Sequence, residues 1–161
     1  GKSTILSAIS RARPKIADYP FTTLHPIIGT IDFGDFSTLR MADIPGLIDG
    51  AHKGVGLGHD FLRHIERTKF LLFVIDMAGV DGRNPVDDYR SLKKELKLYS
   101  KELAGRDFMV VANKMDLPEA AAKLKEFVRR TKIRPLAIAA ATGEGVAELK
   151  EALRERLKPV P

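Results

Sequence analysis

Cysteine is absent from the 161 residues of this sequence. This absence excludes disulfide frameworks, thiolate metal sites and cysteine nucleophiles. Long hydrophobic runs are absent too, since the longest apolar stretch, near residues 70–75, is far too short to cross a membrane. The first residues are small and polar and lack the pattern of a secretory signal. These features predict one soluble, cytosolic globular domain.

Positive charge is in modest excess, with 27 Lys and Arg residues against 21 Asp and Glu residues and a formal net charge of +6. A basic surface attracts polyanions, so the charge balance favours a polyanionic partner without naming one.

Short apolar runs alternate with segments whose apolar residues recur at helical spacing. This alternation predicts an α/β fold with a mixed, mostly parallel sheet and helices on both faces. We expect one helix to begin at Asn84 and Pro85 and to continue to Leu103, a second to open at 117–119, and a third over 146–157. The first two strands should form an antiparallel hairpin. The predicted strands are 27–33, 39–43, 70–76, 108–113 and 134–139.

Polar residues follow the predicted strands where those strands end. Ligands of open α/β sheets bind beyond the carboxyl ends of the strands. The residues delivered there are Asp43, Asp76, Asn113 and the alanine run 139–141. The sequence therefore predicts a polar binding edge.

The chain begins with Gly1-Lys2-Ser3-Thr4 followed by an apolar helical pattern. This string matches the second half of a phosphate-binding loop, in which backbone N–H groups and a helix N-terminus face the phosphates. Lys2 fits the lysine between the β- and γ-phosphates, and Ser3 fits the hydroxyl that binds Mg²⁺. Taken alone, the string is also explained by an ordinary helix start.

A second motif, Asp43-Ile44-Pro45-Gly46, supports the phosphate interpretation. Asp43 can hold Mg²⁺ through water, and the Gly46 N–H can face a γ-phosphate. Thr22 and Thr23 lie in a loop rich in Pro and Gly, where a threonine can join Mg²⁺ when the γ-phosphate is present. Each feature also fits a simple turn or an ordinary surface loop.

The string Asn113-Lys114-Met115-Asp116 follows a predicted strand. The Asp116 carboxylate can accept hydrogen bonds from the N1–H and N2 amino groups of guanine, whereas adenine would leave it unpaired. Asn113 can donate to N7 and brace the loop, and the Lys114 stem can lie across the base. The alternative for Asp116 is a helix N-cap. A backbone N–H in the last loop (Ala139, Ala140, Ala141), that of Ala140 in particular, can reach guanine O6.

These motifs make the sequence resemble a translation-factor-type GTPase domain, and specifically the Obg family, over essentially the whole chain. The distinctive stretches are 14–24, 43–51 and 54–67. The resemblance implies a Ras-like P-loop NTPase domain that binds GTP or GDP and Mg²⁺. It implies catalytic roles for Lys2, Thr23 and Gly46, metal ligation by Ser3, Thr23 and Asp43, nucleotide contacts at Phe21 and Thr22, and a second switch over 50–59.

The resemblance also implies a slow GTPase that acts as a conformational switch in maturation of the large ribosomal subunit. Leu47 stands where Ras-type enzymes carry a water-positioning glutamine, and leucine cannot hydrogen-bond water. Ala139-Ala140 replaces the Ser-Ala that is usual in the family. Ribosomal RNA is then the expected polyanion. The role of His59 and any K⁺ requirement stay open.

Against the family pattern, the chain lacks the first strand and the first half of the phosphate loop. We therefore expect residues 1–161 to be a GTPase domain without its flanking domains, monomeric and cytoplasmic. Two alternatives stay open: a truncated fragment or binding module that does not bind nucleotide, and a P-loop ATPase, which Asp116 disfavours.

Overall fold

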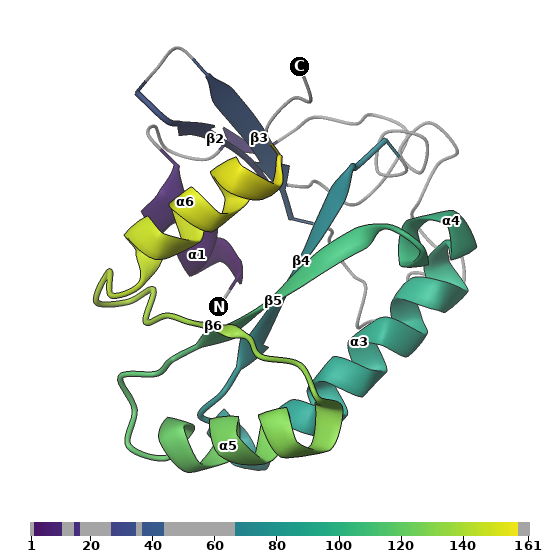
Figure 1. The fold of residues 1–161 in the computed structure, drawn as a ribbon, viewed down its shortest axis with the longest axis vertical. Coiled ribbons are helices and arrows are strands. Elements are labelled where there is room, and N and C mark those ends of the chain that lie inside the picture. The colour runs from purple at the N-terminus through teal and green to yellow at the C-terminus, as the bar shows by residue number, and fades with distance from the viewer. Residues whose placement is uncertain (1, 11–14, 17–26, 35–36, 44–66, 158–161) are drawn as a thin grey trace.

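The computed structural model describes residues 2–10, 15–16, 27–34, 37–43 and 67–157 of the chain. Figure 1 shows the arrangement of the elements. In chain order they are α1 (Lys2–Ile9), β1 (Lys15–Ile16), β2 (Ile27–Asp32), β3 (Thr38–Ala42), β4 (Phe70–Asp76), η2 (Val80–Gly82), α3 (Pro85–Tyr99), α4 (Lys101–Ala104), β5 (Asp107–Asn113), α5 (Ala120–Thr131), β6 (Leu136–Ala137) and α6 (Val146–Arg156).

The described strands form two sheets of three strands each. β2 pairs antiparallel with both β1 and β3, so the predicted hairpin is confirmed. β4, β5 and β6 pair in parallel, in the order β4-β5-β6. The α/β class with a parallel sheet is confirmed. The described residues depart from a mostly parallel arrangement only because the antiparallel strands form a sheet of their own.

Helices cover both faces of the parallel sheet (Figure 1). Along β5, Val110 and Ala112 belong to the core beneath α3 and α5, while the intervening Val111 belongs to the core beneath α1 and α6. Successive strand side chains point to opposite faces. The continuous apolar sequence of β5 therefore feeds two cores at once, as expected for a parallel sheet buried on both sides.

The N-terminus of α3 is capped as the sequence predicts. The Oδ1 atom of Asn84 accepts the N–H groups of Val86 at 2.9 Å and Asp87 at 3.4 Å, and Pro85 occupies the first turn. The predicted continuation to Leu103 is wrong in one respect. Ser100 has an extended backbone that ends α3, and its hydroxyl accepts the Leu103 N–H at 3.1 Å to begin the separate helix α4.

Two other predicted boundaries are corrected. α5 begins at Ala120, since 117–119 form a turn in which the Leu117 N–H donates to the Lys114 carbonyl. The last strand is confined to Leu136–Ala137 because the Ala139 N–H donates to the Glu144 carbonyl at 2.8 Å and closes a loop. None of the described helices combines the length and the apolar character of a membrane span.

Candidate functional site

The carboxyl ends of β4 and β5 bring together two polar residues that the sequence places at strand ends. Asp76 and Asn113 are register partners in the parallel ladder. The loop after β6 reaches the same edge, because the Met115 N–H donates to the Ile138 carbonyl at 3.1 Å. The folded chain therefore brings together Asp76, Asn113 and the loop after β6, whereas Asp43 follows β3 in the other sheet, and the binding role of this edge stays a prediction.

Asn113 is buried at this edge, with 3% of its surface exposed. Its Oδ1 atom accepts the Ala140 N–H at 3.0 Å, and its carbonyl accepts the Met77 N–H at 3.0 Å. One residue thus ties the ends of three strands together. The bracing contact predicted for Asn113 is present.

The same contact changes the expected role of Ala140. Its N–H group, expected to face guanine O6, is already used by the Asn113 side chain. Ala140 is also buried, whereas Ala141 is exposed. Within the described residues the Ala141 N–H has no hydrogen-bond acceptor. Ala141 is therefore the exposed residue of this loop whose N–H group is available to a ligand.

Lys114 leaves β5 with a left-handed backbone, at φ of +65°. Its Nζ donates to Asp76 Oδ2 at 3.0 Å, and the N–H of Ala78 donates to Asp76 Oδ1 at 3.0 Å. Burial tends to raise the pKa of Asp76, but the hydrogen bond and charge of Lys114, together with the N–H groups of Ala78 and Val80, outweigh it and lower the pKa. The carboxylate is therefore ionised at neutral pH.

Asp116 lies in the turn after β5, with an exposed side chain. It is not the N-cap of α5, because that position is Glu119, which makes no side-chain capping bond. Within the described part of the chain, the Asp116 carboxylate has no hydrogen-bond donor or cation as partner. The N-cap alternative is therefore wrong, and the carboxylate is open to a ligand.

The loop 139–145 is compact. The Thr142 and Gly143 N–H groups both donate to the Ala139 carbonyl, at 3.1 and 2.9 Å. Gly145 has φ of +80°, and a Cβ there would lie 2.6 Å from the Ala137 carbonyl oxygen. These bonds and this tight backbone keep the outer residues of the loop at the edge of the parallel sheet.

On the phosphate side, the structure places Lys2, Ser3 and Thr4 in the first turn of α1. Ile5 of α1 belongs to the same buried cluster as Ala140, so this helix packs against the core that supports the last loop. Asp43 directly follows β3 and is half-buried. Among the described residues, no three His, Cys, Asp or Glu side chains gather as a protein-only metal site requires.

Several predicted site residues lie outside the described residues. They are Gly1, Phe21, Thr22, Thr23, Gly46, Leu47, the second switch over 50–59 and His59. Their predicted roles remain predictions.

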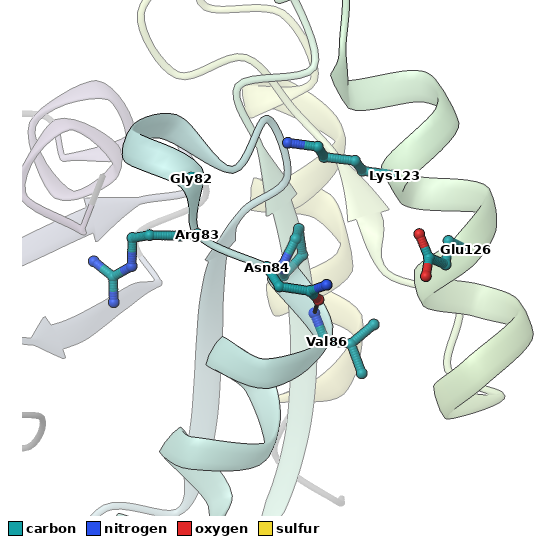
Figure 2. Close-up of a pocket in the computed structure, with 7 residues that line it drawn as sticks. Gly82, Arg83, Asn84, Val86, Lys123 and Glu126 are labelled. Carbon is teal, nitrogen blue, oxygen red and sulfur yellow. Dashed lines mark hydrogen bonds between the residues drawn. The ribbon is translucent and has the colours of Figure 1, made fainter.

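Two hollows in the described structure lie away from the predicted residues. The one in Figure 2, of about 250 Å³, lies between the start of α3 and the side of α5. Its cations are already engaged, since Lys123 Nζ donates to the Ala78 carbonyl at 2.6 Å and Arg83 pairs with Asp88 at 3.4 Å. The other, of about 640 Å³, adjoins Ser10 and Lys150 near the end of α1. Neither hollow is lined by Asp76, Asn113 or the loop 139–145. The candidate site is therefore identified by its polar residues and not by a cavity.

The sequence of this chain matches a known protein family. The family model described as "50S ribosome-binding GTPase" matches residues 1–114, which is more than half of the sequence. The chain belongs to this GTPase family.

Curated relatives of this GTPase chain are named GTPase Obg. One from Roseiflexus castenholzii is 54% identical over 164 residues, covering 100% of this chain and 37% of the relative. Another, from Akkermansia muciniphila, is 53% identical over 156 residues, covering 96% of this chain and 45% of the relative. These matches confirm the resemblance to the Obg family. The chain spans less than half the length of these relatives.

Solved structures confirm the Ras-like P-loop GTPase fold. The cytosolic domain of the T. maritima FeoB iron transporter, in a GMPPNP form, matches with a TM-score of 0.67 and 19% identity, covering 99% of this chain and 60% of that one. A variant of Aquifex aeolicus Era bound to GDP and AlF4⁻ matches with a TM-score of 0.63 and 17% identity, covering 100% of this chain and 54% of that one.

One residue at this edge of the sheet has no role predicted from the sequence. Asp76 was expected only as a polar strand end, and the structure shows it joined to Lys114, 38 residues away. The register between β4 and β5 was the missing signal, because it alone places Asp76 beside Asn113.

Proposed function

We propose that this chain binds guanine nucleotides, hydrolyses GTP slowly with Mg²⁺ and acts as a conformational switch. The observation that carries the proposal is the exposed Asp116 carboxylate beside the braced loop that follows β6. Guanine offers two adjacent donors, N1–H and the N2 amino group, which a carboxylate accepts together. Adenine would leave the carboxylate unpaired, at a cost of about 1–3 kcal/mol or more for a charged group.

The remaining contacts to the base follow from the geometry of the edge. The side-chain oxygen of Asn113, Oδ1, already accepts the Ala140 N–H. Its side-chain NH₂ is therefore the group left to donate to guanine N7. The N–H of Ala141 is the loop donor that we assign to O6. The apolar stem of Lys114 lies across the base while its ammonium stays on Asp76.

Phosphate binding is assigned to the start of α1. The first N–H groups of a helix have no partner within the helix and favour anions. Lys2 would place its ammonium against the β- and γ-phosphates. Thr23 and Gly46 would hold the two switches while the γ-phosphate is present, and its release would free both.

The residues assigned to the metal fit Mg²⁺, because the hydroxyls of Ser3 and Thr23 and the carboxylate of Asp43 are oxygen donors. Magnesium keeps several waters and takes only one or two protein carboxylates beside substrate phosphates. When bound, it neutralises charge on the phosphate oxygens. Leu47 cannot orient an attacking water, so we expect slow unaided hydrolysis.

The wider role proposed is in assembly of the large ribosomal subunit. The net charge of +6 suits ribosomal RNA phosphates. The family model that matches residues 1–114 is described as a 50S ribosome-binding GTPase, which supports the large subunit. An Era structure in complex with MgGDPNP and nucleotides 1506–1542 of 16S ribosomal RNA, an RNA of the small subunit, supports binding of ribosomal RNA in general. We propose that this chain is the GTPase domain of a longer, cytoplasmic protein and is itself monomeric.

Titration with fluorescent GDP and ADP analogues, with and without Mg²⁺, tests the proposal. We expect the GDP analogue to bind selectively and to bind more tightly when Mg²⁺ is present. Indifference to both nucleotides would instead support a binding module without nucleotide, and preference for ADP would support an ATPase.

The Asp116→Asn variant tests base recognition directly. An amide in place of the carboxylate offers a donor where guanine has one and xanthine has a carbonyl, so preference should move from GDP towards xanthosine diphosphate. Glu119→Gln is the matched control. It removes one negative charge three residues after Asp116, and the Glu119 side chain makes no capping bond that the change would break. Unchanged base preference in Asp116→Asn would refute the assignment.

A further inference from the structure

Lys114 adopts a backbone conformation that its residue type disfavours. Its φ of +65° lies in the left-handed region, where a Cβ is crowded and glycine or asparagine is usual. The turn directs the lysine away from the line of β5 and back to the end of β4, where its Nζ meets Asp76. The fold therefore accepts backbone strain to place this side chain.

The carboxylate that receives Lys114 is itself fixed. Asp76 is the last residue of β4 and is paired with Asn113 in the ladder. Its second oxygen accepts the N–H of Ala78, a buried residue whose carbonyl accepts Lys123 Nζ from α5. Figure 2 shows Lys123 reaching from α5 towards the loop that follows β4. Asp76 is thus anchored from the sheet and from the turn behind it.

The pair is poorly placed to stabilise the fold. The side chains of Asp76 and Lys114 are 24% and 37% exposed. Ion pairs with that much solvent contact contribute little to folding, because water screens them. Their main physical effect is to restrict the rotamers of a long, flexible lysine before any ligand arrives.

We infer that Asp76 is a positioning residue for nucleotide binding, which holds the Lys114 stem in the place where the guanine base stacks on it. The inference rests on the proposed function. A lysine that is already ordered loses less conformational freedom when the base binds, so affinity rises without any contact between Asp76 and the nucleotide.

The test is a double-mutant cycle between Asp76→Asn and Lys114→Met, read as the dissociation constant for GDP. Asparagine keeps an oxygen for the Ala78 N–H but loses the charge that holds the ammonium. Methionine keeps an apolar stem but has no ammonium for Asp76 to hold. Asp107→Asn is the matched control, because it removes an ion pair, to Arg156, at the opposite end of β5.

We expect Asp76→Asn to raise the GDP dissociation constant about 3- to 10-fold, the scale of ordering one flexible side chain. In the Lys114→Met background the same change should have no further effect. Asp107→Asn should stay within about 2-fold, and Asp76→Asn and Asp107→Asn should have similar urea midpoints.

A spectroscopic readout separates positioning from general damage. In the wild-type complex, NMR should show cross-relaxation between guanine H8 or the ribose protons and the Lys114 methylenes, and Asp76→Asn should weaken it. Undiminished cross-relaxation, unchanged GDP affinity, or an equal loss of affinity in both backgrounds would overturn the inference. Failure of the wild-type chain to bind GDP would overturn the proposed function and this inference together, whereas the other outcomes overturn this inference alone.

Discussion

Replacing Asn113 by alanine should uncouple the last loop from the sheet. Asn113 is 3% exposed and its Oδ1 accepts the N–H of Ala140, which is 6% exposed. The substitution removes the acceptor but leaves the donor buried in place. An unpaired buried donor costs about 1–3 kcal/mol, and the volume of the lost amide adds a cavity penalty of the same sign.

The loss should be visible without any nucleotide. We expect urea unfolding of the Asn113→Ala variant to show a free energy of unfolding lower by about 2–3 kcal/mol, with an unchanged slope against denaturant. The affinity for GDP should fall as well, about tenfold for each 1.4 kcal/mol of binding energy lost, because the loop no longer holds its donors at the base.

Asn84→Ala is the control for a general loss of stability. It removes the cap of α3, at about 0.5–2 kcal/mol, from a position that the proposed site does not use. The control should lose stability and keep its affinity for GDP. The reasoning is refuted if Asn113→Ala unfolds within about 0.5 kcal/mol of wild type, the range of ordinary surface substitutions.

Two further predictions concern the same edge of the sheet. Gly145→Ala should destabilise the fold by about 1–3 kcal/mol, because φ is +80° and the new Cβ would lie 2.6 Å from the Ala137 carbonyl oxygen. Gly143→Ala is the control, because its φ is also positive but nothing lies within 4 Å of the new Cβ. Thermal unfolding of the two variants would show whether the contact with Ala137 adds to the backbone strain. The lowered pKa of Asp76 means that its ionised form stabilises the native state, by a small amount because the pair with Lys114 is partly exposed. This contribution is complete above the ordinary pKa value of 3.8 and is lost as pH falls through the lower native pKa. Asp76→Asn should therefore lose slightly less stability than wild type in urea titrations between about pH 5 and pH 2, and a greater loss in the variant would contradict the assignment.

Features with a local physical cause were predictable from the sequence. The strand Phe70–Asp76 was predicted with its observed bounds, because six successive apolar residues are followed by one terminal aspartate. The start of α3 followed from Asn84 and Pro85, whose effects extend over one helical turn. The position of Asn113 at the end of a strand and of Asp116 after it was predictable for the same reason.

Features that depend on distant partners were not predictable. The break at Ser100 is the exception, since its partner Leu103 is only three residues away, but apolar residues at helical spacing on both sides concealed the break. The shortness of β6 depends on the Ala139–Glu144 bridge, and the use of the Ala140 N–H depends on an asparagine 27 residues earlier. A hydrogen bond across 27 residues, as between Asn113 and Ala140, exists only after the chain has folded.

The sequence alone therefore determined which chemical groups are available and in what order along the chain. These are a lysine and hydroxyls at the start, an aspartate after one strand, and Asn113 to Asp116 at the end of another. Parallel pairing of β4 with β5 then placed Asp76 within reach of Lys114, and the left-handed turn at Lys114 completed the contact. Residue types define which groups are available to a ligand, whereas register and backbone twist define which of those groups meet. For this reason the candidate nucleotide site could be recognised from motifs, while the residue that positions its lysine required the fold.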